Sequence, residues 1–140
     1  MIDRARLEIF DLFADFDDAS MDAFARATTE RVLAPGEVVF RIGDEGGDLF
    51  LVETGLVEVV LESLEERHGM ARLGPGTFFG EVGMLSRGPR TATVMAMQPT
   101  TLLVMHQTPI NALIDSSHID SLRFSRRLGV AMAYRARSTS

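Results

Sequence analysis

Residues 79–94, with the sequence FGEVGMLSRGPRTATV, hold the side chains most suited to binding chemistry. A strand is predicted to end at the first phenylalanine of this segment, a short helical turn to follow, and a new strand to begin at Arg90. Backbone N–H groups at the start of a helical turn have no intrahelical partner and favour an anion. Gly80 and Gly83 let a phosphate approach the backbone, and the Arg90 guanidinium matches phosphate geometry. The segment therefore predicts a site for a small phosphorylated ligand.

Glu81 narrows the choice of ligand, because a carboxylate repels a phosphate and needs a partner of its own. It can accept a hydrogen bond from a sugar hydroxyl while Arg90 and the amides hold the phosphate. This combination indicates a nucleotide with one compact phosphate beside a free 2′-hydroxyl. Three simpler interpretations stay open: Glu81 only favours a helix N-terminus, Arg90 only pairs with an acid at the surface, and Thr91 is an ordinary strand residue.

The first thirty residues are predicted to form two short helices joined by an acidic turn at Asp17 and Asp18. Apolar residues recur there at three- and four-residue intervals, and Ser20 is the predicted N-cap of the second helix. The apolar positions are Ile9, Leu12, Phe13 and Phe16 in the first helix and Met21, Phe24, Ala25 and Thr28 in the second.

From Arg31 the chain changes to short runs of Val, Leu, Phe and Thr between turns rich in glycine and proline. This pattern predicts an all-β sandwich or barrel, in which turns such as Gly43-Asp44 serve the fold alone. The run after Gly55 predicts two faces: Val57, Val59 and Leu61 on one, and Glu58 with Val60 on the other.

Helices are predicted again at the end of the chain. Thr108 is expected to cap one helix with Pro109 at its first position. Ser117 to Asp120 resembles a capping box for the last helix. The predicted order is therefore helices, β-barrel, helices.

Composition excludes several classes of function. The chain has 140 residues, which suits one compact domain, and its lack of cysteine excludes thiol nucleophiles and thiolate metal sites. With 20 acidic against 14 basic residues the net charge is −6, so nucleic acid is not an expected partner. The three histidines lack the spacing of metal ligands, and no Gly-x-Ser-x-Gly motif surrounds Ser86. No run approaches the about 18 to 20 apolar residues of a membrane span, so we expect a cytoplasmic protein without a membrane partner.

Two segments resemble the cyclic nucleotide-binding domain family: residues 79–94 its phosphate-binding cassette, and residues 33–55 the first half of its β-roll. The resemblance covers about residues 16–115. It implies a mainly β fold with flanking helices, an eight-stranded antiparallel, jelly-roll-like β-roll with N-terminal helices, a short cassette helix and two C-terminal helices. We expect a single domain over 1–140, with N-terminal helices at 1–30, the roll at 31–107, the cassette at 79–91 and the C-terminal helices at 108–137.

The resemblance also implies roles for individual residues. Arg90 would bind the exocyclic oxygens of a cyclic phosphate, and Glu81 the ribose 2′-hydroxyl. Thr91 would contact phosphate or base and bear on the choice between cAMP and cGMP. The remaining residues that would line the cassette are Gly80, Val82 and Gly83, the last at a position where the family frequently has alanine.

The expected function is a non-catalytic sensor that binds cAMP, ahead of cGMP, and signals by repositioning its C-terminal helices. We expect no cofactor other than this ligand, an effector that the sequence does not identify, and a monomer or homodimer. Two alternatives stay open: an interaction module that has lost the ligand, and a cupin-like metal enzyme, which needs clustered His and carboxylate ligands.

Overall fold

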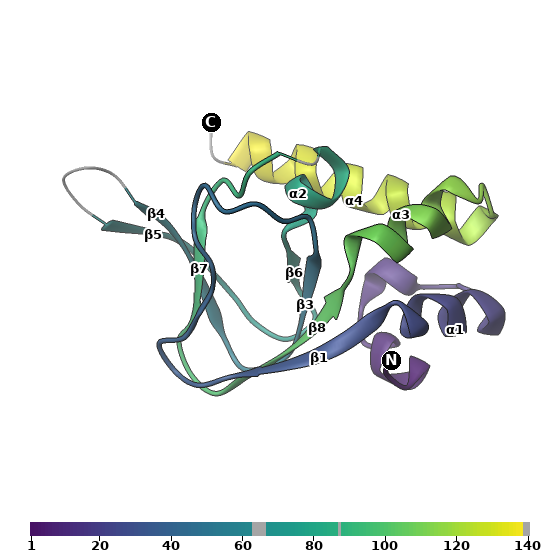
Figure 1. Ribbon diagram of the computed structural model, residues 1–140, viewed down its shortest axis with the longest axis horizontal. Helices are drawn as coiled ribbons and strands as arrows, with labels where there is room; N and C mark the ends of the chain where they lie inside the picture. The colour runs from purple at the N-terminus through teal and green to yellow at the C-terminus, as the bar shows by residue number, and fades with distance from the viewer. Residues whose placement is uncertain (63–66, 87, 139–140) are drawn as a thin grey trace. The chain divides into compact units, whose positions relative to one another are not determined.

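The computed structural model describes residues 1–62, 67–86 and 88–138, which group into two compact units. The helical unit comprises Met1–Thr29 and Met105–Ser140, and the β unit comprises Glu30–Val104 (Figure 1). Each unit is described by itself below, and the expected single domain over 1–140 remains a prediction.

The β unit carries the roll, whose eight strands form two four-stranded sheets in the orders β1-β8-β3-β6 and β2-β7-β4-β5. Printed pairings such as β3 with β6 and β4 with β7 are antiparallel, which confirms the predicted β-roll. The strands are β1 Thr28–Leu33, β2 Val38–Phe40, β3 Leu49–Thr54, β4 Val57–Glu62, β5 Arg67–Leu73, β6 Phe78–Phe79, β7 Thr93–Ala96 and β8 Thr100–Met105.

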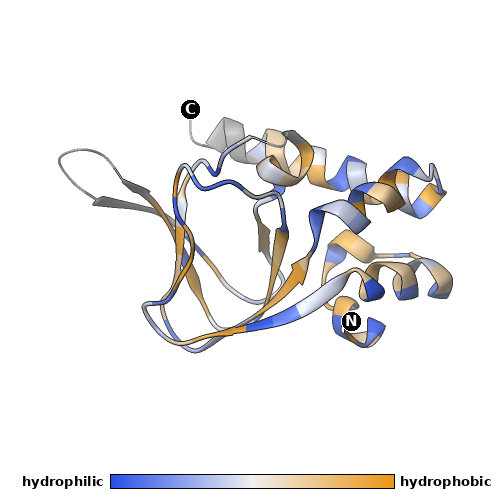
Figure 2. Ribbon diagram, viewed as in Figure 1, coloured by the Kyte–Doolittle hydropathy of each residue, from blue (hydrophilic) through white to orange (hydrophobic). Residues whose placement is uncertain are grey.

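Alternating apolar residues from both sheets fill the interior of the roll. The core includes Leu33, Val39, Phe50, Val52, Val57, Phe79, Val94, Ala96, Leu102 and Val104. Figure 2 shows the apolar colour along these strands, whereas the loop between β2 and β3 is largely hydrophilic. Because side chains alternate across a strand, one face of each sheet is buried and the loops are left for binding chemistry.

The predicted alternation in β4 is wrong at one position. Val57 and Val60 are both fully buried, while Val59 is only half-buried. The register of β4 against β5 shifts between Val59 and Val60, so a β-bulge moves Val60 to the buried face. The side chain of Leu61 lies outside the described residues.

The helical unit contains two 3-10 helices, Arg4–Leu7 and Asp11–Phe13, followed by α1 Asp18–Arg26, α3 Gln107–Asp115 and α4 Ile119–Ser138. Aromatic rings join these segments: the ring centroids of Phe24 and Phe124 are 4.8 Å apart, and those of Phe13 and Phe124 are 5.8 Å apart. Phe24, Phe124 and Leu128 have no more than 1% of their surface exposed, so the apolar stripes of α1 and α4 are buried.

The N-terminal boundaries differ from the prediction. The first helix is replaced by the two 3-10 helices, and α1 is capped by Asp17, whose carboxylate accepts a hydrogen bond from the Ser20 amide at 2.7 Å. Ser20 therefore lies inside α1, because Asp17 satisfies the free N–H groups earlier in the chain. Thr28 begins β1 and does not end a helix.

The caps predicted for the last two helices are also wrong. The N-cap of α3 is His106, without a side-chain hydrogen bond, and Pro109 is the third helical residue. A proline is tolerated there because amides of the first turn have no intrahelical partner. Nδ1 of His118 accepts the Asp120 amide at 3.1 Å, so an imidazole caps α4 in place of a capping box.

Candidate functional site

The short helix α2 Glu81–Ser86 follows β6 directly, with Gly80 as the joint between them. Figure 1 shows α2 at the end of the roll where the loop between β2 and β3 also passes. Gly80 has φ +92, and a Cβ atom at this position would lie 2.8 Å from the carbonyl oxygen of Asp48. Both the backbone conformation and the lack of space therefore require glycine.

Arg90 is held by its backbone to the same loop. Its amide donates to the carbonyl of Asp44 at 2.9 Å, and its carbonyl accepts from the amide of Gly43 at 2.8 Å. The Ile42 amide donates to Oγ1 of the buried Thr93 at 3.0 Å, which extends the contact. The loop between β2 and β3 is thereby fixed against the start of β7. The Gly43-Asp44 turn, assigned to the fold alone from sequence, positions the arginine.

The Arg90 side chain turns inward and is only 6% exposed. Its Nη2 donates to the Asp48 carbonyl at 2.9 Å, and its Nη1 donates to the Gly80 carbonyl at 3.3 Å. Its Cζ lies 4.2 Å from the centre of the Phe40 ring, a distance at which a cation is attracted to the ring face. We call this arrangement the tucked position of Arg90.

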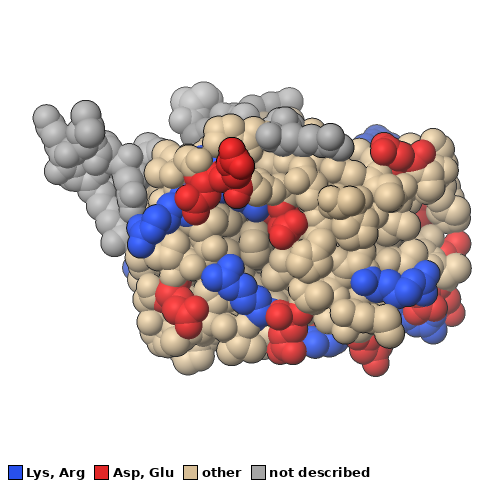
Figure 3. Space-filling model, viewed as in Figure 1, with Lys and Arg blue, Asp and Glu red and all other residues tan. Residues whose placement is uncertain are grey.

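The electrostatic surroundings of Arg90 are acidic. Burial has the largest effect and lowers the pKa of the guanidinium, while the carboxylates of Asp48, Asp44 and Glu81 act in the opposite direction. Arginine nevertheless stays protonated at physiological pH. Figure 3 shows acidic side chains gathered over the loop between β2 and β3, where the sequence places Asp44, Glu45 and Asp48. A bound anion would therefore depend strongly on Arg90.

Glu81 is the first residue of α2 and is only 4% exposed. An acid in the first turn is favoured by the helix dipole, but that effect does not require burial. Charged side chains are rarely buried without a specific partner, since desolvation is costly. A buried carboxylate and a buried guanidinium in one short segment form an acceptor beside a donor.

Gly83 lies inside α2, where glycine is about 1 kcal/mol less favourable than alanine. A Cβ atom at Gly83 would lie 2.8 Å from Nη1 of Arg90 and 2.9 Å from the carbonyl oxygen of Gly46. The missing side chain therefore makes room for the guanidinium and for the neighbouring loop.

The structure brings four of the six predicted site residues together: Gly80, Glu81, Gly83 and Arg90. Val82 is half-buried in α2, and Thr91 is exposed in the bend before β7. The binding roles of all six remain predictions. Sequence analysis missed three partners of Arg90, namely Phe40, Gly46 and Asp48. The only local signal for them is the glycine- and acid-rich run between β2 and β3.

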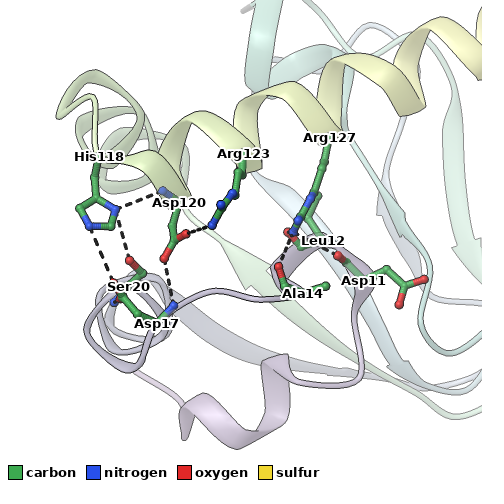
Figure 4. Close-up of polar contacts among 9 residues, drawn as sticks. All are labelled: Asp11, Leu12, Ala14, Asp17, Ser20, His118, Asp120, Arg123 and Arg127. Carbon is green, nitrogen blue, oxygen red and sulfur yellow. Dashed lines mark hydrogen bonds and ion pairs between the residues drawn. The ribbon is translucent and has the colours of Figure 1, made fainter.

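A second polar cluster lies in the helical unit (Figure 4). Oγ of Ser20 is 3.4 Å from Nδ1 of His118, and Nε2 of His118 is 3.9 Å from a carboxylate oxygen of Asp17. This order is that of a Ser-His-Asp triad, which the sequence did not suggest. However, Nδ1 of His118 already accepts the Asp120 amide, and Asp17 caps α1. The cluster is accounted for by helix capping.

Two further features were searched among residues 1–62, 67–86 and 88–138. No group of three or more His, Cys, Asp or Glu side chains in this part of the chain could hold a metal ion. No helix in it has the length and apolar character needed to span a bilayer.

Comparison with known proteins extends this picture. Residues 30–117 match the family model described as the cyclic nucleotide-binding domain. A cyclic nucleotide-gated potassium channel of Mesorhizobium japonicum is 37% identical over 106 residues, which cover 76% of this chain and 28% of the channel. A cAMP-dependent protein kinase regulatory subunit of Yarrowia lipolytica is 31% identical over 108 residues, which cover 76% of this chain and 28% of the subunit. Their names describe a channel and a regulatory subunit, not catalysts.

Solved structures share the fold. The catabolite activator protein of Thermus thermophilus has a TM-score of 0.80 and 29% identity, covering 91% of this chain and 59% of that one. A cyclic nucleotide-binding domain from Methylobacillus flagellatus has a TM-score of 0.84 at 22% identity, covering 96% of this chain and 80% of that one. The family match includes the whole β-roll and the cassette, with Glu81 and Arg90 in it. The chain belongs to the cyclic nucleotide-binding domain family.

Proposed function

We propose that this chain is a regulatory module that binds cAMP, ahead of cGMP, through the cassette at 79–91. The observation that carries the proposal is the burial of two opposite charges, Arg90 at 6% and Glu81 at 4% exposure, beside two glycines. A surface ion pair or a helix-dipole contact would leave these groups in water, where ions are most stable. Perturbed, desolvated charges of this kind are typical of binding sites.

The proposed roles follow from the donors and acceptors of each group. The Arg90 guanidinium donates to the exocyclic oxygens of the cyclic phosphate, and Glu81 accepts from the ribose 2′-hydroxyl. Gly80, Val82 and Gly83 line the ligand, and Thr91 contacts phosphate or base. The name of the Yarrowia relative, a cAMP-dependent regulatory subunit, supports cAMP as the ligand.

We further propose that binding is signalled by a change in the position of the C-terminal helices α3 and α4. A ligand shifts such an equilibrium only by binding one arrangement more tightly than the other. The effector stays unidentified, the chain acts as a monomer or homodimer in the cytoplasm, and no catalytic step is part of the proposal. The chain spans 28% of the length of the channel and kinase-subunit relatives, so the activity of a whole protein rests on this proposal alone.

The sharpest test compares cAMP with 2′-deoxy-cAMP by calorimetry. The wild-type chain is expected to bind the deoxy ligand about tenfold or more weakly, because a hydrogen bond to a charged group contributes about 1.5 to 3 kcal/mol. Glu81→Ala is expected to bind both ligands with nearly equal affinity. Glu45→Ala removes an exposed acid from the neighbouring loop and serves as the matched control that keeps the preference.

Two results would contradict the proposal. An unchanged preference for cAMP in Glu81→Ala would remove Glu81 from the ribose contact. A wild-type chain that gives no heat of binding and no rise in unfolding temperature with cAMP or cGMP would identify the module as one without the ligand, since any ligand of the folded state stabilises it.

A further inference from the structure

The starting observation is that the backbone at Gly83 does not require glycine. Its φ lies outside the left-handed region, in contrast to φ +92 at Gly80. An interior helix glycine is destabilising relative to alanine, so space is the remaining reason for it. That space is taken by Nη1 of Arg90 and by the carbonyl oxygen of Gly46, at 2.8 Å and 2.9 Å from where a Cβ atom would lie.

The tucked position directs the guanidinium toward the protein. Nη1 and Nη2 each donate to a backbone carbonyl, and the ring of Phe40 covers one face of the group. A bidentate contact with a phosphate needs two N–H groups aimed at its oxygens. Phosphate binding therefore competes with the carbonyls of Gly80 and Asp48 for the same two nitrogens.

We propose that Gly83 is a positioning residue that admits Arg90 to the tucked position and thereby weakens the affinity of the cassette for a cyclic phosphate. A methyl group at residue 83 would overlap Nη1, which is the end of a flexible side chain and can move outward. The protein would then no longer have to break the two carbonyl contacts before binding. The effect on affinity rests on the proposed function, whereas the positioning of Arg90 does not.

The positioning is tested first without any nucleotide, by thermal unfolding of Gly83→Ala, Arg90→Ala and the double variant. Gly129→Ala is the matched control, because Gly129 lies in α4 and a Cβ atom there would meet nothing within 4 Å. We expect Gly129→Ala to raise the unfolding temperature and Gly83→Ala to lower it by about 3 °C. In the Arg90→Ala background the loss caused by Gly83→Ala should shrink, because the overlap with Nη1 is gone.

A spectroscopic measurement reports on the guanidinium itself. The Nε–H signal of Arg90, assigned by its absence in Arg90→Lys, should exchange slowly with water in the wild-type chain. In Gly83→Ala it should exchange about tenfold faster, as expected when a buried group becomes exposed. The Gly129→Ala control should leave this signal unchanged.

The affinity is then measured by calorimetry with cAMP. Gly83→Ala is expected to bind about threefold to tenfold more tightly, the size of effect that a partly populated competent state has on apparent affinity. Faster exchange with weaker binding would mean that the tucked position is itself the binding geometry, and would overturn the proposed competition. A Gly83→Ala variant that matches Gly129→Ala in unfolding and in Arg90 exchange would overturn the positioning role.

Two outcomes separate this inference from the proposed function. If the wild-type chain binds no cyclic nucleotide, the proposed function fails, while unfolding and exchange still decide the positioning role. If Gly83→Ala does not fold, recovery of folding in the double variant supports the overlap with Arg90. Failure of the double variant as well assigns the overlap to the Gly46 carbonyl and overturns the inference.

Discussion

Two arginines, one in each unit, use the same contacts for different ends. Arg90 donates to two backbone carbonyls over the ring of Phe40, and Arg127 donates to the carbonyls of Asp11, Leu12 and Ala14 over the ring of Phe16. In Figure 4, Arg127 extends from α4 to the N-terminal segment and joins the two.

The surroundings of the two arginines differ. Arg127 is half-buried, whereas Arg90 is 6% exposed, lies within electrostatic reach of the buried Glu81 and borders two glycines. An arginine bound to carbonyls is therefore a structural device by itself. The buried acid and the missing Cβ atoms beside it are what distinguish the cassette as a candidate site.

The largest expected effect separates these two arginines. Arg90→Ala should weaken cAMP binding by about 100-fold, which corresponds to about 3 kcal/mol, because it removes a charge-assisted bidentate contact. Arg127→Ala should leave cAMP affinity within about threefold. It should lower the free energy of unfolding by about 1 to 2 kcal/mol, since several carbonyls lose a donor. Calorimetry and urea unfolding measure the two quantities.

An equal loss of affinity in both variants would remove the distinction between a binding arginine and a structural one. Unchanged affinity in Arg90→Ala would remove Arg90 from the site. Arg126→Ala, which alters an exposed arginine on the same helix as Arg127, controls for the loss of one positive charge.

The next effect concerns the glycine joint of the cassette. Gly80→Ala is expected to lower the free energy of unfolding by about 1 to 3 kcal/mol, because the residue has φ +92 and its Cβ would lie 2.8 Å from the Asp48 carbonyl. Gly129→Ala in the helical unit should be neutral or stabilising. Urea unfolding measures both, and a Gly80→Ala chain as stable as the Gly129→Ala control would show that the joint tolerates a side chain.

The cassette was predictable from sequence to the extent that its chemistry is local. Gly80, Glu81 and Arg90 lie within one short segment, and each residue type suggests its own role. The partners of Arg90 were not predictable in this way. Asp48 precedes Arg90 by 42 positions, so its carbonyl meets the guanidinium only because β2, β3 and β7 fold into one roll.

The roll itself was predicted well, since alternation and turn residues repeat along it, whereas boundaries failed where two local solutions compete. Asp17 and Ser20 are both good N-caps, and the contact that decides between them forms only in the folded chain. The bulge in β4 similarly depends on its pairing with β5. Such choices are set by tertiary contacts, which no single segment contains.

A smaller effect is expected from acid, and it concerns the helical unit. Burial alone would raise the pKa of Asp120, but hydrogen bonds from the Asp17 amide, Ser20 and Arg123 outweigh it and lower the pKa below its ordinary value of 3.8. A lowered pKa means that Asp120 stabilises the fold above its unfolded-state pKa. That stability is lost as the pH falls through the lower folded-state value.

Asp120→Asn tests this dependence. It should cost about 1 to 2 kcal/mol at neutral pH, because a charged acceptor becomes neutral, and it should lose less stability than the wild-type chain between pH 5 and pH 3. Asp17, whose pKa is lowered chiefly by the Ser20 amide, and His118 face the same cluster and contribute the remaining dependence. Equal acid losses in both proteins would assign the acid sensitivity to groups other than Asp120.

The smallest effect concerns the aromatic ring under each arginine. The Arg90 Cζ lies 4.2 Å from the Phe40 ring centre, and the Arg127 Cζ lies 5.4 Å from that of Phe16. Phe40 also packs against Phe50 at 5.7 Å, so a single substitution would mix the loss of core packing with the loss of the cation contact. A double-mutant cycle cancels the packing loss and leaves the coupling between the two side chains.

Urea unfolding of Phe40→Leu, Arg90→Met and their combination should give a coupling of about 0.5 to 1 kcal/mol. The matching cycle of Phe16→Leu with Arg127→Met should give less than about 0.5 kcal/mol, because the longer distance and the greater exposure weaken the attraction. Equal couplings would show that burial does not strengthen the cation–ring contact in the cassette. Arg90 would then be retained in its tucked position by the carbonyls alone, and Phe40 would act only as part of the core.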